Sequence, residues 1–181
     1  MTIGSGVTLV RGGDGCGKTT LLSLLAGALR ADAGQLQVNG IALDEQPHAY
    51  RQQVFWVDPR STTSDQMTQA AYFAALPAHY PGFDPQCLAD MIDGLSLTPH
   101  LDKSLYMLST GSKRKVWLAA AVASGAAVLL LDGPFTALDK VSVDFVMALL
   151  HDAAARPVRA WVIADYEAPG DVPLAAIIDL G

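Results

Sequence analysis

The sequence predicts an α/β fold with a mainly parallel sheet and an inserted helical subdomain. Short apolar runs that fit buried strands recur along the chain, and segments with helical periodicity alternate with them. Apolar residues make up 51% of the 181 residues, which is enough for one substantial core. We therefore expect a single domain over residues 1–181, with an α/β core at 1–60 and 112–181 and a helical subdomain at about 61–111.

The first predicted strand, Val7–Val10, leads directly into a glycine cluster, and apolar residues then repeat at helical spacing over Lys18–Leu29. Two more short strands are predicted at Gln35–Val38 and Val54–Val57. The turn Asn39-Gly40 and a polar stretch separate them. This order of strand, loop and helix opens the α/β core.

Helical periodicity dominates the middle of the chain, where prolines and glycines flank two helical segments. Beyond this region, helices again alternate with fully apolar runs of strand length, which is typical of parallel strands buried on both faces. The predicted helices are Asp65–Leu76, Pro85–Ile92, Ser112–Ser124 and Asp139–Ala154, and the predicted buried strands are Ala127–Leu131 and Arg159–Ile163.

Composition argues against several classes of function. The formal net charge of −6 gives no general attraction to nucleic-acid phosphates, so we expect no nucleic-acid partner. Cys16 and Cys87 lie outside any metal-ligand spacing, which predicts reduced thiols in a cytoplasmic protein. The longest uncharged run, Val116–Leu131, is shorter than the roughly 20 residues that a membrane span needs. Any membrane role must therefore come through a partner.

The segment GGDGCGKT fits the pattern GxxxxGK[ST] and lies between a predicted strand and a predicted helix. Its glycines would let backbone N–H groups turn toward phosphate oxygens at a helix N-terminus. Lys18 would reach the β- and γ-phosphates, and the Thr19 hydroxyl would ligate Mg²⁺. A glycine-rich turn with an incidental Lys-Thr pair is the competing interpretation, and the flanking strand and helix argue against it. The predicted nucleotide-binding residues are Gly12, Gly13, Asp14, Gly15, Cys16, Gly17, Lys18, Thr19 and Thr20.

Three later segments point to one family within the P-loop NTPases. The run LSTGS at 108–112 resembles the LSGGQ-type signature of ABC ATPases, from which Thr110 and Ser112 depart. The run VLLLD at 128–132 looks like a Walker B strand, and GPFTALD at 133–139 resembles the family's continuation, including a D-loop at Ala137–Asp139. The resemblance to ABC-type nucleotide-binding domains covers nearly the whole chain, and the order of the motifs is highly specific.

The resemblance implies ATP as the bound nucleotide, with Mg²⁺ held by Thr19 and by Asp132, which ends a buried strand. Two such domains pair head to tail in the family, so Ser109, Thr110 and Gly111 of one would face ATP held by the other. We therefore expect a second nucleotide-binding domain as partner, in a homodimer or a heterodimer. A separate transmembrane subunit would hold the protein at the cytoplasmic side of the membrane.

Three positions depart from the family's hydrolytic residues. Gly133 stands where a glutamate polarises the attacking water, and Tyr166 stands where a switch histidine follows the last core strand. Asp58 stands where a glutamine contacts the metal, and it is either a third metal oxygen or the opener of a turn before Pro59. Losing a positioned base typically costs roughly 10²–10⁴-fold in rate, whereas nucleotide binding rests on other groups. We expect binding with impaired hydrolysis, so enzymatic activity stays open.

The leading expectation is an ATP-binding subunit of an ABC transporter. A non-hydrolytic, nucleotide-gated binding or assembly module is the alternative that Gly133 and Tyr166 favour. A small-molecule P-loop kinase is opposed by the signature and the D-loop.

The basic run Lys113–Lys115 is interpreted as a solvated helix face. The chain begins only a few residues before its first strand, so we expect the family's leading antiparallel strands and their adenine-stacking aromatic to be absent.

Overall fold

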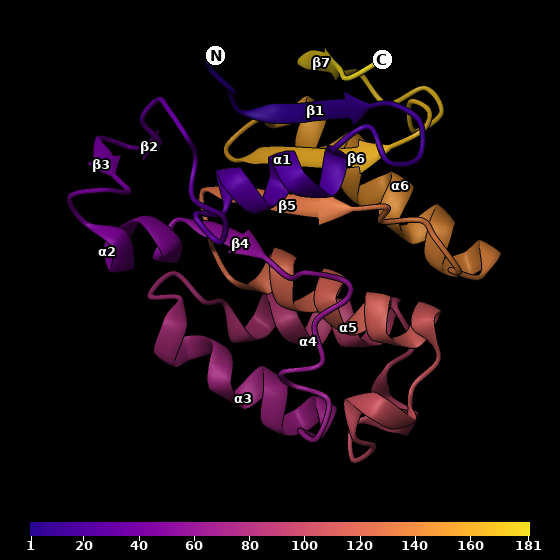
Figure 1. Ribbon diagram of the computed structural model, residues 1–181. Coiled ribbons are helices and arrows are strands. Elements are labelled where there is room, and N and C mark those ends of the chain that lie inside the picture. Colours follow the sequence, from indigo (N-terminus) through magenta and orange to yellow (C-terminus); the bar gives the residue numbers. More distant parts are fainter.

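The computed structural model describes residues 1–181 and contains a five-stranded parallel sheet flanked by helices (Figure 1). The strand order is β4-β5-β6-β1-β7, and every neighbouring pair is parallel. The predicted α/β class with a mainly parallel sheet is therefore confirmed. The strands are β1 (Gly6–Arg11), β4 (Val54–Trp56), β5 (Val128–Asp132), β6 (Ala160–Asp165) and β7 (Ala176–Asp179).

Helices cover both faces of this sheet, and a small antiparallel hairpin lies beside it (Figure 1). The helices are α1 (Lys18–Leu25), α2 (Pro47–Gln52), α3 (Gln69–His79), α4 (Pro85–Gly94), α5 (Thr110–Ala123) and α6 (Lys140–Ala155), with 3-10 turns at Thr98–His100 and Leu105–Met107. The hairpin pairs β2 (Gln37–Val38) with β3 (Ile41–Ala42). None of these helices is both long and apolar enough to cross a bilayer.

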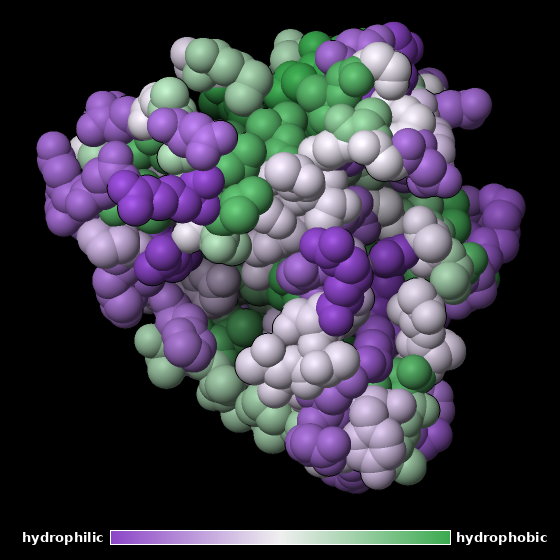
Figure 2. Space-filling model, viewed as in Figure 1, coloured by the Kyte–Doolittle hydropathy of each residue, from purple (hydrophilic) through white to green (hydrophobic).

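Alternate residues of the central strands point into two separate cores, which explains why these strands are apolar throughout. On β5, Leu129 and Leu131 belong to the larger core with α5 and α6, whereas Leu130 belongs to a smaller core under α1 and α2. Partly buried apolar residues extend the smaller core outward, and Val38 and Ile41 of the β2–β3 hairpin are among them. Figure 2 shows a hydrophobic area in the upper part of this face of the molecule.

The larger core continues without interruption from the sheet into α3 and α4, which pack against α5. Two glycines allow these parts to approach each other closely. A Cβ at Gly94 of α4 would lie 2.3 Å from the ring of Phe145 on α6, and a Cβ at Gly125 would lie 1.9 Å from the carbonyl oxygen of Gly82. The helical segment occupies the range where the sequence places it, and its status as a subdomain stays a prediction.

Several elements differ from the expected bounds. Helix α1 ends at Leu25 rather than Leu29, because Gly27 adopts a left-handed backbone with φ of +64°. Helix α3 begins after Thr68 rather than at Asp65, because the Thr68 hydroxyl caps it by accepting from an amide. The sequence patterns did not predict α2, β3 or the exposed edge strand β7.

Candidate nucleotide-binding site

The glycine-rich loop joins the end of β1 to the start of α1, as the sequence predicts. Gly15 and Gly17 have φ of +74° and +102°, a backbone region in which an L side chain is strained. A Cβ at Gly12 would lie 2.4 Å from the Sγ of Cys16, so a larger residue there would require that thiol to move. Both cysteines of the chain are free thiols. The loop conformation thus depends on its glycines.

Lys18 lies with its ammonium group over this loop. Its Nζ donates to the carbonyl oxygens of Gly12 and Gly13 at 2.6 and 2.7 Å. The same Nζ lies 4.6 Å from the centre of the Tyr166 ring, within the range of a cation–π contact. The lysine charge is therefore held at the centre of the loop, between the glycine backbone and the end of β6.

The predicted metal-binding pair comes together from opposite parts of the chain. The Thr19 hydroxyl on α1 donates to Oδ2 of Asp132, at the end of β5, over 2.6 Å. Hydroxyl and carboxylate oxygens are the hard ligands that Mg²⁺ prefers, so this donor set fits the ion. A metal at this site would draw on Thr19 and Asp132.

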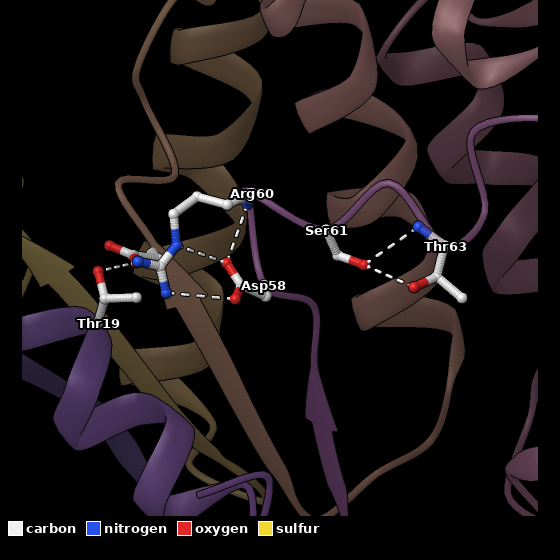
Figure 3. A network of polar contacts seen from close by, with 6 residues as sticks. Thr19, Asp58, Arg60, Ser61 and Thr63 are labelled. Carbon is white, nitrogen blue, oxygen red and sulfur yellow. Dashed lines mark hydrogen bonds and ion pairs between the residues drawn. The ribbon is translucent and has the colours of Figure 1, made fainter.

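Asp58 does not join this pair. Its carboxylate accepts from the backbone N–H of Arg60 at 2.9 Å and from the Arg60 guanidinium at 3.1 and 3.3 Å (Figure 3). The hydrogen bond from the Arg60 side chain lowers the pKa of Asp58, and the Asp58 carbonyl accepts from the Ser61 amide. Of the two interpretations that the sequence left open, the geometry supports the turn opener over the metal ligand.

A polar cavity of about 370 Å³ opens in front of the glycine-rich loop. Five segments that are distant in sequence form its wall: the loop with the start of α1, the turn after β4, Arg114 of α5, the end of β5 with the residues that follow it, and the end of β6 with Tyr166. Cationic, carboxylate and hydroxyl side chains all face it. Its lining residues are Asp14, Gly15, Gly17, Lys18, Thr19, Thr20, Pro59, Arg60, Arg114, Asp132, Gly133, Thr136, Ala164, Asp165 and Tyr166.

Gly133 presents only backbone to this cavity. Its φ of +54° lies in the left-handed region, and its N–H donates to the carbonyl oxygen of Ala164 at 2.8 Å. A Cβ built there would lie 2.8 Å from Oγ1 of Thr136. The backbone at this position is therefore shaped for glycine, and a glutamate would require it to rearrange.

Tyr166 lies directly after β6, at the edge of the cavity, and its side chain is largely exposed. Its hydroxyl donates to the carboxylate of Asp14 in the glycine-rich loop. This hydrogen bond raises the pKa of Tyr166, because a nearby carboxylate disfavours the phenolate. The phenol is therefore a neutral donor near pH 7, and it bridges the loop and β6.

The signature segment lies outside the cavity of its own chain. Ser109 is the exposed N-cap of α5, and its Oγ accepts from the Ser112 amide at 3.2 Å. Thr110 is also exposed, whereas Gly111 is buried against the D-loop. A Cβ at Gly111 would lie 2.1 Å from the carbonyl oxygen of Ala137. The D-loop therefore contacts the signature within one chain.

The basic run after the signature is not a solvated face, so that interpretation is wrong. Lys113 pairs with Asp65 at 2.6 Å, and Lys115 pairs with Asp139 of the D-loop at 2.5 Å. Arg114 is 8% exposed and donates to the carbonyl oxygen of Thr136, just before the D-loop, at 3.0 Å. The folded chain brings acidic and carbonyl groups to these cations, and sequence periodicity does not reveal them.

Comparison with known proteins decides the family. The family model described as "ABC transporter" matches residues 2–136. The chain belongs to the ABC transporter family. It shares its fold with a solved dimeric ATP-binding cassette in a post-hydrolysis state bound to ADP and Pi, with a TM-score of 0.74 and 20% identity over 92% of this chain and 78% of the other.

Among curated relatives, this ABC family member is similar to proteins named "Cytochrome c biogenesis ATP-binding export protein CcmA". The one from Pseudomonas syringae pv. syringae is 35% identical over 137 residues, which are 75% of this chain and 64% of the relative. The one from Escherichia coli K12 is 33% identical over 135 residues, again 75% and 64%. The chain thus spans slightly less than two thirds of the length of these relatives.

Proposed function

We propose that this chain is an ATP-binding subunit of an ABC transporter that binds Mg-ATP and hydrolyses it slowly. One observation carries the proposal. The cavity holds the complete phosphate-binding and metal-binding set, Lys18 with Thr19 and Asp132, while the neighbouring Gly133 offers no side chain to activate water.

The electrostatics of the cavity suit a polyphosphate. Three cationic side chains line it, namely Lys18, Arg60 and Arg114. Guanidinium and ammonium groups bind phosphate oxygens through charge-assisted hydrogen bonds. The positive end of α1 also points into the cavity through the glycine-rich loop. These groups support binding of ATP phosphates close to the Thr19–Asp132 pair.

Hydrolysis lacks its usual machinery. A glycine cannot accept a proton, and the phenol of Tyr166 is bonded to Asp14 rather than free to contact a γ-phosphate. Asp58 is engaged by Arg60. The absence of a positioned base typically lowers a rate by roughly 10²–10⁴-fold, so binding and turnover should separate.

A groove of about 470 Å³ between α2, β4 and α3 is the proposed docking surface for a separate membrane subunit. Its lining includes Trp56, Val57, Met67, Tyr72 and Tyr80, which form an aromatic and apolar floor of the kind that accepts a helix. Trp56 and Val57 directly precede the turn that reaches the phosphate cavity. A partner seated there would sense the state of the nucleotide and would place the chain at the cytoplasmic side of the membrane.

The similarity to export proteins of cytochrome c biogenesis supports an export system as the setting. A second cassette is the other proposed partner, because the signature residues Ser109, Thr110 and Gly111 lie away from their own cavity. Whether that cassette is a copy of this chain decides between two functions. In a homodimer both sites would lack the glutamate, and a nucleotide-gated assembly module becomes the better description.

Equilibrium ATP binding and steady-state ATPase activity, measured on the same preparation, test this proposal. We expect clear binding, and turnover far below the enzyme median of roughly 10 s⁻¹. Lys18→Ala should abolish tight binding, because it removes the charge that meets the β- and γ-phosphates. Lys140→Ala is the matched control, since that lysine is exposed and pairs with Asp144 within α6. Unchanged ATP affinity in a folded Lys18→Ala variant would rule out this site.

The docking surface has a separate test in the ATPase activity measured with and without the membrane subunit. Met67→Lys should reduce the response to that subunit, because it places a charge on the apolar floor of the groove. Val158→Lys is the control, because Val158 is 83% exposed and does not line the groove. An equal response from both variants would place the partner on another surface.

A further inference from the structure

The turn after β4 presents an arginine to the phosphate cavity. Asp58 and Pro59 open this turn, which is closed by the hydrogen bond from the Ser61 amide to the Asp58 carbonyl at 2.9 Å. One Asp58 carboxylate oxygen also accepts from the Arg60 amide at 2.9 Å. The backbone around Arg60 is therefore held from both sides.

The side chain of Arg60 is held by the same carboxylate. Its Nε and Nη2 donate to the two oxygens of Asp58 at 3.1 and 3.3 Å, while Nη1 makes no hydrogen bond within the protein. The side chain is 74% exposed. Arg60 thus has an oriented guanidinium with donors left over for a ligand.

Arg60 lines the cavity together with Thr19 and Asp132, whereas Asp58 does not line it. Figure 3 shows the guanidinium between Asp58 and the side of the cavity that holds Thr19. The pKa of Arg60 is raised by its hydrogen bond to Asp58 and, more weakly, by the charge of Asp132. The guanidinium therefore lies close enough to Thr19 and Asp132 to share a ligand with them.

We infer that Arg60 binds the γ-phosphate of ATP held in its own chain, in the region where the family's glutamine would act. This inference rests on the proposed nucleotide binding. A bound metal in P-loop enzymes bridges the β- and γ-phosphates, so a group beside Thr19 and Asp132 lies near the terminal phosphate. The planar guanidinium donates to two phosphate oxygens at once, which a glutamine amide cannot match in charge or geometry.

The other cavity arginine cannot take this role as readily. Arg114 is 8% exposed, and its Nη1 is committed to the carbonyl oxygen of Thr136. Arg60 is therefore the cavity arginine that keeps donors for a ligand. A contact made only with the third phosphate makes the chain discriminate ATP from ADP without a catalytic base, which is what a nucleotide-gated subunit with impaired hydrolysis needs.

The test is isothermal titration calorimetry of the full chain with two probes, ADP and β,γ-imido ATP, each measured with MgCl₂ and with EDTA. The variants are Arg60→Ala, Arg60→Lys and, as a matched control remote from the cavity, Arg156→Ala. We expect Arg60→Ala to weaken binding of the triphosphate about tenfold while ADP binding stays unchanged, because a hydrogen bond to a charged group is lost only with the γ-phosphate. Arg60→Lys should keep part of the preference for the triphosphate over ADP, with MgCl₂ and with EDTA. Arg156→Ala should keep the whole preference.

An Arg60→Ala variant with the wild-type preference for the triphosphate would overturn the inference, and so would an equal loss of affinity for both probes. If wild-type protein binds neither probe, nucleotide binding itself fails and the inference fails with it. That outcome is distinguishable from the others, because they occur only when the wild type binds. Circular dichroism of each variant checks that the exposed substitution has left the fold intact.

Discussion

Gly111 of the signature packs on the D-loop of its own chain, so Gly111→Ala should destabilise the fold before any nucleotide or partner is present. The family resemblance assigns this glycine only to ATP held by a second cassette. In the structure it is buried, and a Cβ built on it would lie 2.1 Å from the carbonyl oxygen of Ala137 and 3.1 Å from its carbonyl carbon. A contact role within the chain therefore accompanies the predicted role at the dimer interface.

The size of the effect follows from the geometry. Ordinary Cβ contacts begin at 3.4 Å, so the carbonyl oxygen would have to retreat by about 1.3 Å, the difference from 2.1 Å. Ala137 has a φ of +61°, so its backbone is already in a costly region and has little freedom to adjust. Overpacking of this kind costs about 3 kcal/mol, and the helix propensity of alanine over glycine returns up to about 1 kcal/mol. The net loss of about 2 kcal/mol corresponds to a fall in Tm of about 4–8 °C for a domain of this size.

Thermal unfolding of the purified chain, followed by circular dichroism without nucleotide, measures this loss. Gly4→Ala is the control, because a Cβ there meets nothing within 4 Å and its backbone is not left-handed. That variant should stay within about 2 °C of the wild type. A Gly111→Ala variant with the Tm of the control would show that the D-loop backbone moves at little cost in free energy, and the packing argument would be refuted.

Three further predictions concern the site and its surroundings. Gly133→Glu should raise steady-state ATP turnover only modestly, because its backbone is left-handed and the glutamine and histidine positions stay altered; full recovery of a rate near roughly 10 s⁻¹ would contradict this. In a complex with a cassette of intact sequence, Ser109→Arg should nearly abolish ATPase activity, whereas Asp132→Asn should mainly weaken Mg-ATP retention at this chain's own site. A larger loss of ATPase activity from Asp132→Asn than from Ser109→Arg would refute the assignment of the two sites. Asp139→Asn should lower the free energy of unfolding near neutral pH, because the hydrogen bond from Lys115 holds the pKa of Asp139 below its ordinary 3.8. A carboxylate with a depressed pKa stabilises the fold at pH values above its unfolded pKa, and this stabilisation is lost as the pH falls through its folded pKa. In denaturant titrations, the difference in free energy of unfolding between variant and wild type should therefore shrink below about pH 4. A gap that stays constant down to about pH 2 would contradict that linkage.

The sequence by itself determined the class of fold and the location of the phosphate loop. The pattern that begins at Gly12 and ends at Thr19 predicts a strand before it and a helix after it, and the structure has both. Apolar runs of strand length likewise predicted β5 and β6, because strands buried on both faces are composed mainly of apolar residues. The order of the motifs indicated the ABC family. These features are local in the chain, so local patterns carry them.

Short or exposed elements were not predicted, because their local sequence carries no such pattern. Strand β7 is an edge strand whose residues are mostly exposed, so it has no apolar alternation to detect. Helix α2 has 6 residues, which is less than two turns, and starts at Pro47, and its polar residues suggested a loop. Its position depends on Tyr50, which is buried and donates from its hydroxyl to the carbonyl of Leu25. That contact joins α2 to α1, and nothing in the sequence of α2 indicates it.

Only the tertiary structure decided which side chains meet. Thr19 and Asp132 are 113 positions apart, and the sheet brings them to within 2.6 Å because α1 packs beside the end of β5. The turn after β4 brings Arg60 to the cavity wall, whereas Asp58 does not line the cavity. Lys115 pairs with Asp139, 24 positions later, because the start of α5 packs against the D-loop. Contacts between segments that are distant in sequence depend on directions in space that a residue's sequence neighbours do not set, so motifs predict the presence of a site while the fold determines which distant groups meet there.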